Sequence, residues 1–299
     1  MQIEHRTPQL SISTKRHIVG GTILAAIVLL TGFAIKYSGA AKSIAYVGFR
    51  EIHHHSTQWR TRNWLSLEGD NFVIRYQPED KDMAGLILET SEEAYAPVNR
   101  ILGYEPRGKG LVLVYPSRID FGKSFGWGAE QRAMGVYWAG VIRVLSPKDW
   151  ITDVTGDGVE EVFKSSGPVV HEYAHLVVDH IARGNYPRWL TEGVAQYVER
   201  EITGFVFTDS IIKDGESWYE FKEIDKHFDT AEGQFKSYRQ SLAVVDYMVV
   251  RYGEGSIEGI LNTLKTGMPL KSAWKAAFGE TLDEFEHGFN NWSGMAVSD

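Results

Sequence analysis

The residues best suited to chemistry stand close together at His171, Glu172 and His175. Pro168 favours a helix start just before them, and Gly184 favours its end. On a helix, residues four apart lie on one face, so both imidazoles can reach a single metal ion. Glu172 lies beside them, where it can act as a general base toward a water molecule. This spacing predicts a metal-dependent hydrolase site, although three fixed positions also arise by chance.

A second segment strengthens this prediction. Glu192 follows His175 after sixteen intervening residues, with a turn expected at residues 183–185. A second helix returning antiparallel would place Glu192 opposite the two histidines. Gly193 and Ala195 are small enough to permit close approach of the two helices. Two histidines and a carboxylate, with a fourth position open to water, are typical of a catalytic zinc site rather than a structural one.

Composition narrows the chemistry further. The chain has 299 residues and no cysteine, which excludes disulfides, thiolate metal ligands and a cysteine nucleophile. Its formal net charge of -8 provides no basic field, so no nucleic-acid partner is expected. His53, His54 and His55 are adjacent and cannot share one face of a helix or strand. A solvated tract is expected there, with adventitious metal binding as the alternative.

Across about residues 166–200, His-Glu-x-x-His followed by Trp-Leu-x-Glu-Gly-x-Ala resembles the gluzincin metallopeptidases, specifically the peptidase MA-like group. The stretch is also similar to the zinc aminopeptidases. The resemblance implies a thermolysin-like α+β fold, with Zn²⁺ bound by His171, His175 and Glu192 and with Glu172 as the base.

The same resemblance implies a later tyrosine or histidine that donates a hydrogen bond to the oxyanion. Tyr238 is the candidate, and a buried core tyrosine is the alternative interpretation of that residue. The resemblance also implies a protein or peptide substrate that lies along a sheet edge above the active-site helix. Residues 134–146 are the expected location of that edge.

The sequence departs from related patterns in three ways. The spacing from His175 to Glu192 is shorter than in thermolysin-like enzymes or the aminopeptidases. The Gly-x-Met-Glu-Asn motif of the aminopeptidases is absent, so an endopeptidase is expected and exopeptidase action stays open. The metzincin pattern fails because Val178 and Ile181 occupy its glycine and histidine positions. His180 is one residue out of register and is expected on the polar face or around the metal ligands.

Hydrophobic patterning predicts the elements that position these residues. Strands are expected at residues 72–76 and 110–115, a hairpin at 135–138 and 141–145, and a helix at 83–102. A small, largely antiparallel sheet with a helix against it is the expected arrangement. From about Val159 onward the pattern is mainly helical, so the fold class is α+β.

The N-terminus carries a candidate membrane segment. Residues 18–35 form an apolar run without charge, about the minimum length for a spanning helix. We expect a transmembrane signal anchor at residues 18–36. A cleavable signal peptide, which would give a secreted form, is the alternative because small residues follow at 38–41. The basic residues on the two sides nearly balance, but a short tail before a large domain favours an extracytoplasmic domain.

The predicted organisation has four parts and no assigned oligomeric state. They are an N-terminal tail (1–17), the anchor (18–36), a juxtamembrane connector (37–70) and a peptidase MA-like domain (71–299) with an α/β half (71–158) and a helical half (159–299).

These features predict a membrane-anchored zinc metallopeptidase. The alternative is a catalytically inactive, membrane-tethered metal-binding or protein-interaction domain of the same fold. Glu172 discriminates between them, because an inactive protein has no reason to keep a carboxylate beside both histidines.

Overall fold

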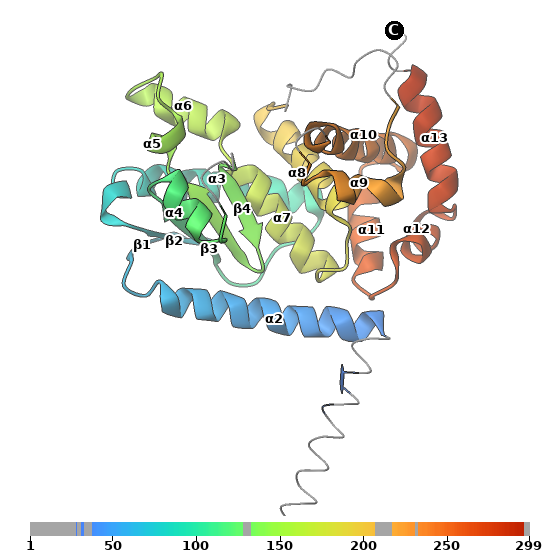
Figure 1. Cartoon of the computed structure of the whole chain (residues 1–299), viewed down its shortest axis with the longest axis horizontal. Coiled ribbons are helices and arrows are strands. Elements are labelled where there is room, and N and C mark those ends of the chain that lie inside the picture. The colour runs from blue at the N-terminus through green and yellow to red at the C-terminus, as the bar shows by residue number, and fades with distance from the viewer. Residues whose placement is uncertain are drawn as a thin grey trace, which may run out of the picture.

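The computed structural model describes residues 28, 31–32, 38–127, 133–206, 217–230 and 233–295. It combines one five-stranded sheet with a mostly helical remainder, so the expected α+β class is confirmed (Figure 1). Beyond β5 the described residues form helices and connecting segments without a further strand, in agreement with the predicted helical half.

The sheet is mixed, and the expectation of a largely antiparallel sheet is wrong at its centre. The strands are β1 (Leu65–Glu68), β2 (Phe72–Tyr76), β3 (Gly110–Tyr115), β4 (Gly135–Trp138) and β5 (Val141–Leu145). Their order is β1-β2-β3-β5-β4, with β2–β3 and β3–β5 parallel and the outer pairs antiparallel. The reason is the helical crossover between β2 and β3, which returns the chain to the edge where β2 began. The predicted hairpin of β4 and β5 is confirmed.

From residue 38 onward, the described residues contain thirteen helical segments. They are α2 (Gly39–Arg60), η1 (Pro78–Asp80), α3 (Ala84–Leu102), α4 (Arg118–Lys123), α5 (Pro147–Trp150), α6 (Asp157–Ser166), α7 (Val169–Ala182), α8 (Arg188–Thr203), α9 (Phe221–His227), α10 (Gln234–Tyr252), α11 (Ser256–Leu264), α12 (Leu270–Phe278) and α13 (Leu282–Met295). The helix expected at 83–102 is therefore confirmed within one residue.

The two faces of the sheet bury different clusters. Successive side chains of a strand point to opposite faces. Val112 and Val114 of β3 join the main core, which also contains α3 and α7. Leu113 and Tyr115 join a smaller cluster on the other face, together with Phe121 of α4. The sheet thus separates α7 from a second, thinner layer.

The predicted connector contains a long helix that packs along the domain. Figure 1 shows α2 beneath both the sheet and the helical half. Gly39 at its start touches Gly267, in the segment after α11. Arg50 at its middle is buried, and its Nη1 lies 3.2 Å from a carboxylate oxygen of Asp179 on α7. This ion pair couples α2 to the helix that carries the two histidines.

The histidine run of α2 is not simply solvated. Nδ1 of His53 lies 3.0 Å from the carbonyl oxygen of Ala139, and Nδ1 of His54 lies 2.9 Å from that of Gly140. Both imidazoles therefore donate to the turn between β4 and β5, and only His55 is exposed. The expectation of a solvated tract is wrong for two of the three residues, because the tract packs against a hairpin tip.

No helix among the described residues is long and apolar enough to span a bilayer. The anchor predicted at residues 18–36 lies outside the described residues except at positions 28, 31 and 32. It stays a prediction.

The contact of α8 with α10 gives a test of the packing that supports the site. Gly193 lies against Ser241, and a Cβ at this position would collide with the Ser241 carbonyl oxygen and crowd Val245. Gly193→Ala is expected to lower the free energy of unfolding by about 2 kcal/mol or more, as overpacking does. Urea unfolding of the two proteins measures the difference.

Gly259→Ala is the matched control. Gly259 lies in α11 with no atom within 4 Å of an added Cβ, so this change should leave stability equal or raise it by up to about 1 kcal/mol. Equal stability of Gly193→Ala and wild type would show that α8 and α10 do not depend on this close approach.

Candidate metal centre

Helix α7 presents its two histidines on one face and its apolar residues on the other. Val170, Ala174, Val177, Val178 and Ile181 are all buried. The opposite face carries His171 and His175, whose side chains are 17% and 12% exposed. The local sequence therefore produces a helix that is anchored by its apolar side and open on its histidine side.

Helix α8 brings Glu192 to this face, as expected. The chain turns after α7 through Arg183 and Gly184, and α8 then packs along α7. Trp189, Leu190 and Val194 bury the inner side of α8. Glu192 lies between these apolar residues in sequence but faces the histidines, and its side chain is only 11% exposed.

The three side chains converge on one point. Nε2 of His171 and Nε2 of His175 are 3.1 Å apart. Oε2 of Glu192 lies 3.5 Å from the first nitrogen and 3.4 Å from the second. Ligand atoms that share a tetrahedral zinc at about 2.0–2.1 Å are separated by about 3.3 Å. This group could therefore hold a metal ion, and its spacing fits a small divalent cation.

The outer nitrogens of both imidazoles are also satisfied. Nδ1 of His171 lies 3.0 Å from Oε2 of Glu199, and Nδ1 of His175 lies 2.7 Å from Oγ1 of Thr191. A carboxylate can only accept, so His171 carries its proton on Nδ1 and leaves Nε2 with a lone pair. This lone pair faces Nε2 of His175 at 3.1 Å, an arrangement that a shared proton or a cation would stabilise. The donor set thus calls for a positive charge.

The charges of the site act strongly on each other. Burial alone would lower the pKa of His171, but hydrogen bonds and charges from Glu192 and Glu199 raise it well above its usual value. Burial alone would raise the pKa of Glu192, but His175 and His171 bring it well below its usual value. The negative charges of Glu192 and Glu199 favour the protonated form of His171. A divalent cation bound at the same point would be stabilised by these charges in place of the proton.

Glu172 lies beside this group and contacts the sheet. Its side chain is buried, and its Oε2 accepts a hydrogen bond of 2.6 Å from the backbone N–H of Tyr137 on edge strand β4. Burial raises the pKa of Glu172, while the two histidines and this N–H act in the opposite direction. Gly135 permits the approach, because a Cβ there would lie 2.8 Å from Cγ of Glu172.

Tyr238 lies near the candidate ligands, at the first turns of α10. Its side chain is half-buried and forms a hydrogen bond with Arg188, whose Nε lies 3.5 Å from Oε1 of Glu192. Burial and the charge of Glu192 raise the pKa of Tyr238, so its hydroxyl keeps its proton at neutral pH. It can therefore donate a hydrogen bond.

His180 lies elsewhere. Its ring packs edge-on against Tyr104 at 6.5 Å between centroids, on the side of α7 that faces Arg50. Burial and Arg50 lower the pKa of His180 to about 4, so it is neutral at pH 7. His180 was expected either on the polar face of the helix or around the metal ligands. It does not lie around the metal ligands.

Four residues of this site were missed by the sequence. Glu199 is two helical turns after Glu192, and this seven-residue spacing could have indicated it. Thr191, Arg188 and the backbone of Tyr137 carry no such signal, because their roles depend on how α8 and β4 pack on α7.

Comparison with known families identifies the superfamily of the chain. The sequence model of the Peptidase MA superfamily matches residues 135–294, more than half of the chain. The chain belongs to this superfamily. The match begins at β4 and includes every candidate site residue, so the peptidase MA region is the one that carries the metal-binding group. Membership supports a peptidase-like hydrolase.

Two individual proteins are also similar to the chain. "Uncharacterized protein YhcO" of Bacillus subtilis (strain 168) is 22% identical over 233 residues, which cover 72% of this chain and 67% of that protein. Among solved structures, aminopeptidase A of Legionella pneumophila in complex with aspartic acid matches with a TM-score of 0.46 and 16% identity. That match covers 76% of this chain but only 27% of the aminopeptidase. A similarity at this level carries no information about activity.

The carboxylate behind His171 provides a test of the peptidase MA site. Glu199→Gln keeps the shape of the side chain but removes the charge that orients and polarises the imidazole. Metal affinity is expected to fall about tenfold or more, as losses of such supporting contacts do. Competition with a chromophoric chelator measures the affinity.

Glu201→Gln serves as the control, since Glu201 is exposed on the same helix. Equal affinities for all three proteins would contradict the supporting role of Glu199.

Proposed function

We propose that this protein is a zinc-dependent metallopeptidase of the gluzincin type, with His171, His175 and Glu192 as metal ligands and Glu172 as the general base. The observation that carries the proposal is the convergence of both Nε2 atoms and Oε2 of Glu192 on one point, with the Glu172 carboxylate buried beside them. Membership of the Peptidase MA superfamily supports the same conclusion.

Each residue has a definite part in this chemistry. When bound, zinc would polarise the carbonyl of the scissile amide and lower the pKa of a water molecule toward 7. Glu172 takes the proton of the attacking water and passes it to the leaving amine. Its buried position supports this role, because burial raises the pKa of the carboxyl toward the value that suits a shuttle.

The proposed substrate is a protein or peptide, cleaved internally. Strand β4 is at the edge of the sheet and borders Glu172, so an extended peptide paired with β4 would run past the metal-binding group.

We also propose that residues 18–36 anchor the chain in a membrane and that the catalytic domain lies outside the cytoplasm. The support is the apolar sequence of that segment and the position of α2, which begins three residues after it and lies along the domain.

Glu172→Gln tests the division between ligands and base. The full-length protein is expected to bind about one zinc per chain by elemental analysis, and the variant should retain it. Turnover of casein or of a quenched peptide library should fall by about 100-fold or more, the usual range for a lost general base.

Glu161→Gln, at an exposed position on α6, should leave both zinc and turnover unchanged. Stoichiometric zinc without turnover in any of the three proteins would favour the inactive metal-binding domain. A folded wild-type protein that binds no zinc would overturn the proposal.

Tyr238→Phe tests the proposed donor to the oxyanion. Loss of one such donor lowers kcat by about 10²–10³-fold in other hydrolases, with little change in KM. The same direction is expected here, and zinc content should not change because Tyr238 is not a ligand. An unchanged kcat would assign Tyr238 to packing against Phe228, with which its ring makes an edge contact at 5.1 Å.

A further inference from the structure

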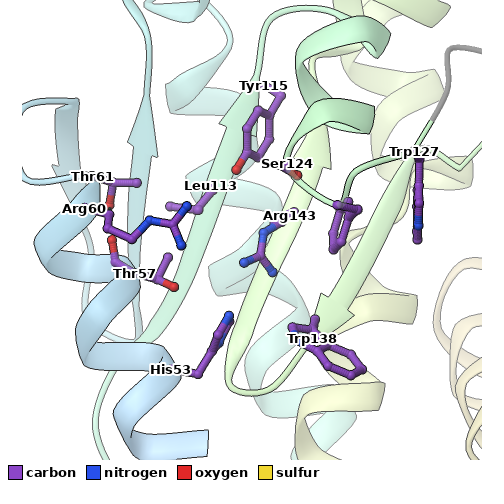
Figure 2. Close-up of a pocket in the computed structure, with 11 residues that line it drawn as sticks. His53, Thr57, Arg60, Thr61, Leu113, Tyr115, Ser124, Trp127, Trp138 and Arg143 are labelled. Carbon is purple, nitrogen blue, oxygen red and sulfur yellow. The ribbon is translucent and has the colours of Figure 1, made fainter.

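A pocket lies on the face of the sheet opposite α7. It has a volume of about 480 Å³ and is bordered by the C-terminal half of α2, by strands β3, β4 and β5, and by the segment after α4 (Figure 2). Its main polar and aromatic residues are His53, Arg60, Tyr115, Trp127, Trp138 and Arg143. The proposed peptidase chemistry uses none of them.

Arg143 is the unusual residue of this pocket. It belongs to β5, between Ile142 and Val144, and only 7% of it is exposed. Among the described residues, its Nε and Nη1 have no hydrogen-bond partner. The Tyr115 hydroxyl and the ring of Phe125, 5.0 Å from the guanidinium carbon, are its neighbours. A buried charge with unmet donors is costly unless an anion completes it.

Two further groups point into the same space. Figure 2 shows the guanidinium groups of Arg60 and Arg143 turned toward each other, with the ring of His53 beside them. The two arginines are near enough that the charge of Arg60 lowers the pKa of Arg143, beyond the effect of burial. His53 donates from Nδ1 to the carbonyl of Ala139, which fixes the ring and leaves Nε2 for the pocket. The described residues that line the pocket include no carboxylate, and two like charges gathered in this way form an anion-binding arrangement.

The rest of the lining is aromatic. Trp127 stacks on Phe125 with 4.4 Å between ring centroids and is 39% exposed, and Trp138 is 54% exposed. Indole rings offered to solvent at the mouth of a cationic pocket favour a ligand with a flat apolar part.

We infer that this pocket binds a small organic oxyanion, a carboxylate or a phosphate attached to a flat apolar group. The anion pairs with Arg143 and Arg60, because a guanidinium donates two parallel hydrogen bonds to either oxyanion. The apolar part packs against Trp127 and Trp138. The inference does not rest on the metal centre, which is on the other side of the sheet.

Calorimetric titration of the full-length protein with phenyl phosphate and with benzoate tests this site. The protein is first treated with a chelator, so that anions cannot bind through a metal. At least one ligand is expected to bind with a Kd of about 1 mM or tighter, and phenol should bind at least about tenfold more weakly. Binding of phenyl phosphate alone identifies a phosphate site, and binding of benzoate alone a carboxylate site. Absence of binding by both overturns the inference.

Three variants place the binding in this pocket. Arg143→Met should weaken it by about tenfold or more, and Arg60→Gln by about threefold because Arg60 is exposed. Arg62→Gln is the control, since Arg62 is exposed and lies over the ring of Trp59 at 4.2 Å, outside the lining. Unchanged affinity in both Arg143→Met and Arg60→Gln would overturn the assignment.

A thermal melt separates binding from structure. Arg143→Met should melt at the same temperature as the ligand-free wild type or above it, because it removes a buried charge with two unpartnered nitrogens. A lower melting temperature together with unchanged affinity in Arg60→Gln would show that Arg143 serves the fold alone.

Discussion

The arrangement around the metal-binding group depends on one fully buried carboxylate. Asp179 in α7 has no exposed surface, and it accepts hydrogen bonds from Arg50 of α2, Tyr137 of β4 and Tyr186 in the segment before α8. An ionised carboxylate cannot be buried without such donors. One side chain of α7 therefore holds two segments that are distant in sequence, α2 and β4, and the nearby segment that leads into α8. Of these, β4 carries Tyr137, whose N–H donates to Glu172, and the segment before α8 leads to Glu192.

Local sequence determines part of this fold. Helix α7 and the hairpin of β4 and β5 follow from hydrophobic period and turn residues, and both form where the pattern predicts them. The parallel centre of the sheet does not follow, because strand direction depends on where a crossover helix returns the chain. Helix α2 was missed for a different reason. Its buried residues are Ser43, Arg50 and Thr57, which are spaced by seven but polar, so its fully buried positions give no hydrophobic signal.

The candidate site divides in the same way. The positions of His171, Glu172 and His175 follow from spacing on a single helix. To predict Glu192 as a ligand, we had to assume further that a second helix returns antiparallel to the first. The turn after α7 brings the chain back in this way. The contacts to the outer imidazole nitrogens come from Thr191 and Glu199, and they arise only when α8 lies against α7. A spacing rule can therefore find ligands, whereas the groups that tune them depend on packing.

If the protein works as proposed, the hydrogen bond between Glu172 and Tyr137 N–H would link substrate binding to the strength of the base. A peptide that pairs with β4 would compete for that N–H and so release the Glu172 carboxylate. The lost hydrogen bond had lowered the pKa of Glu172, so its release makes the carboxylate more basic. In a peptidase that works as proposed, Glu172 would therefore be a weaker base in the free enzyme than in the enzyme with a peptide bound. Strand β4 would then bind the peptide and also make the basicity of Glu172 depend on whether a peptide is bound.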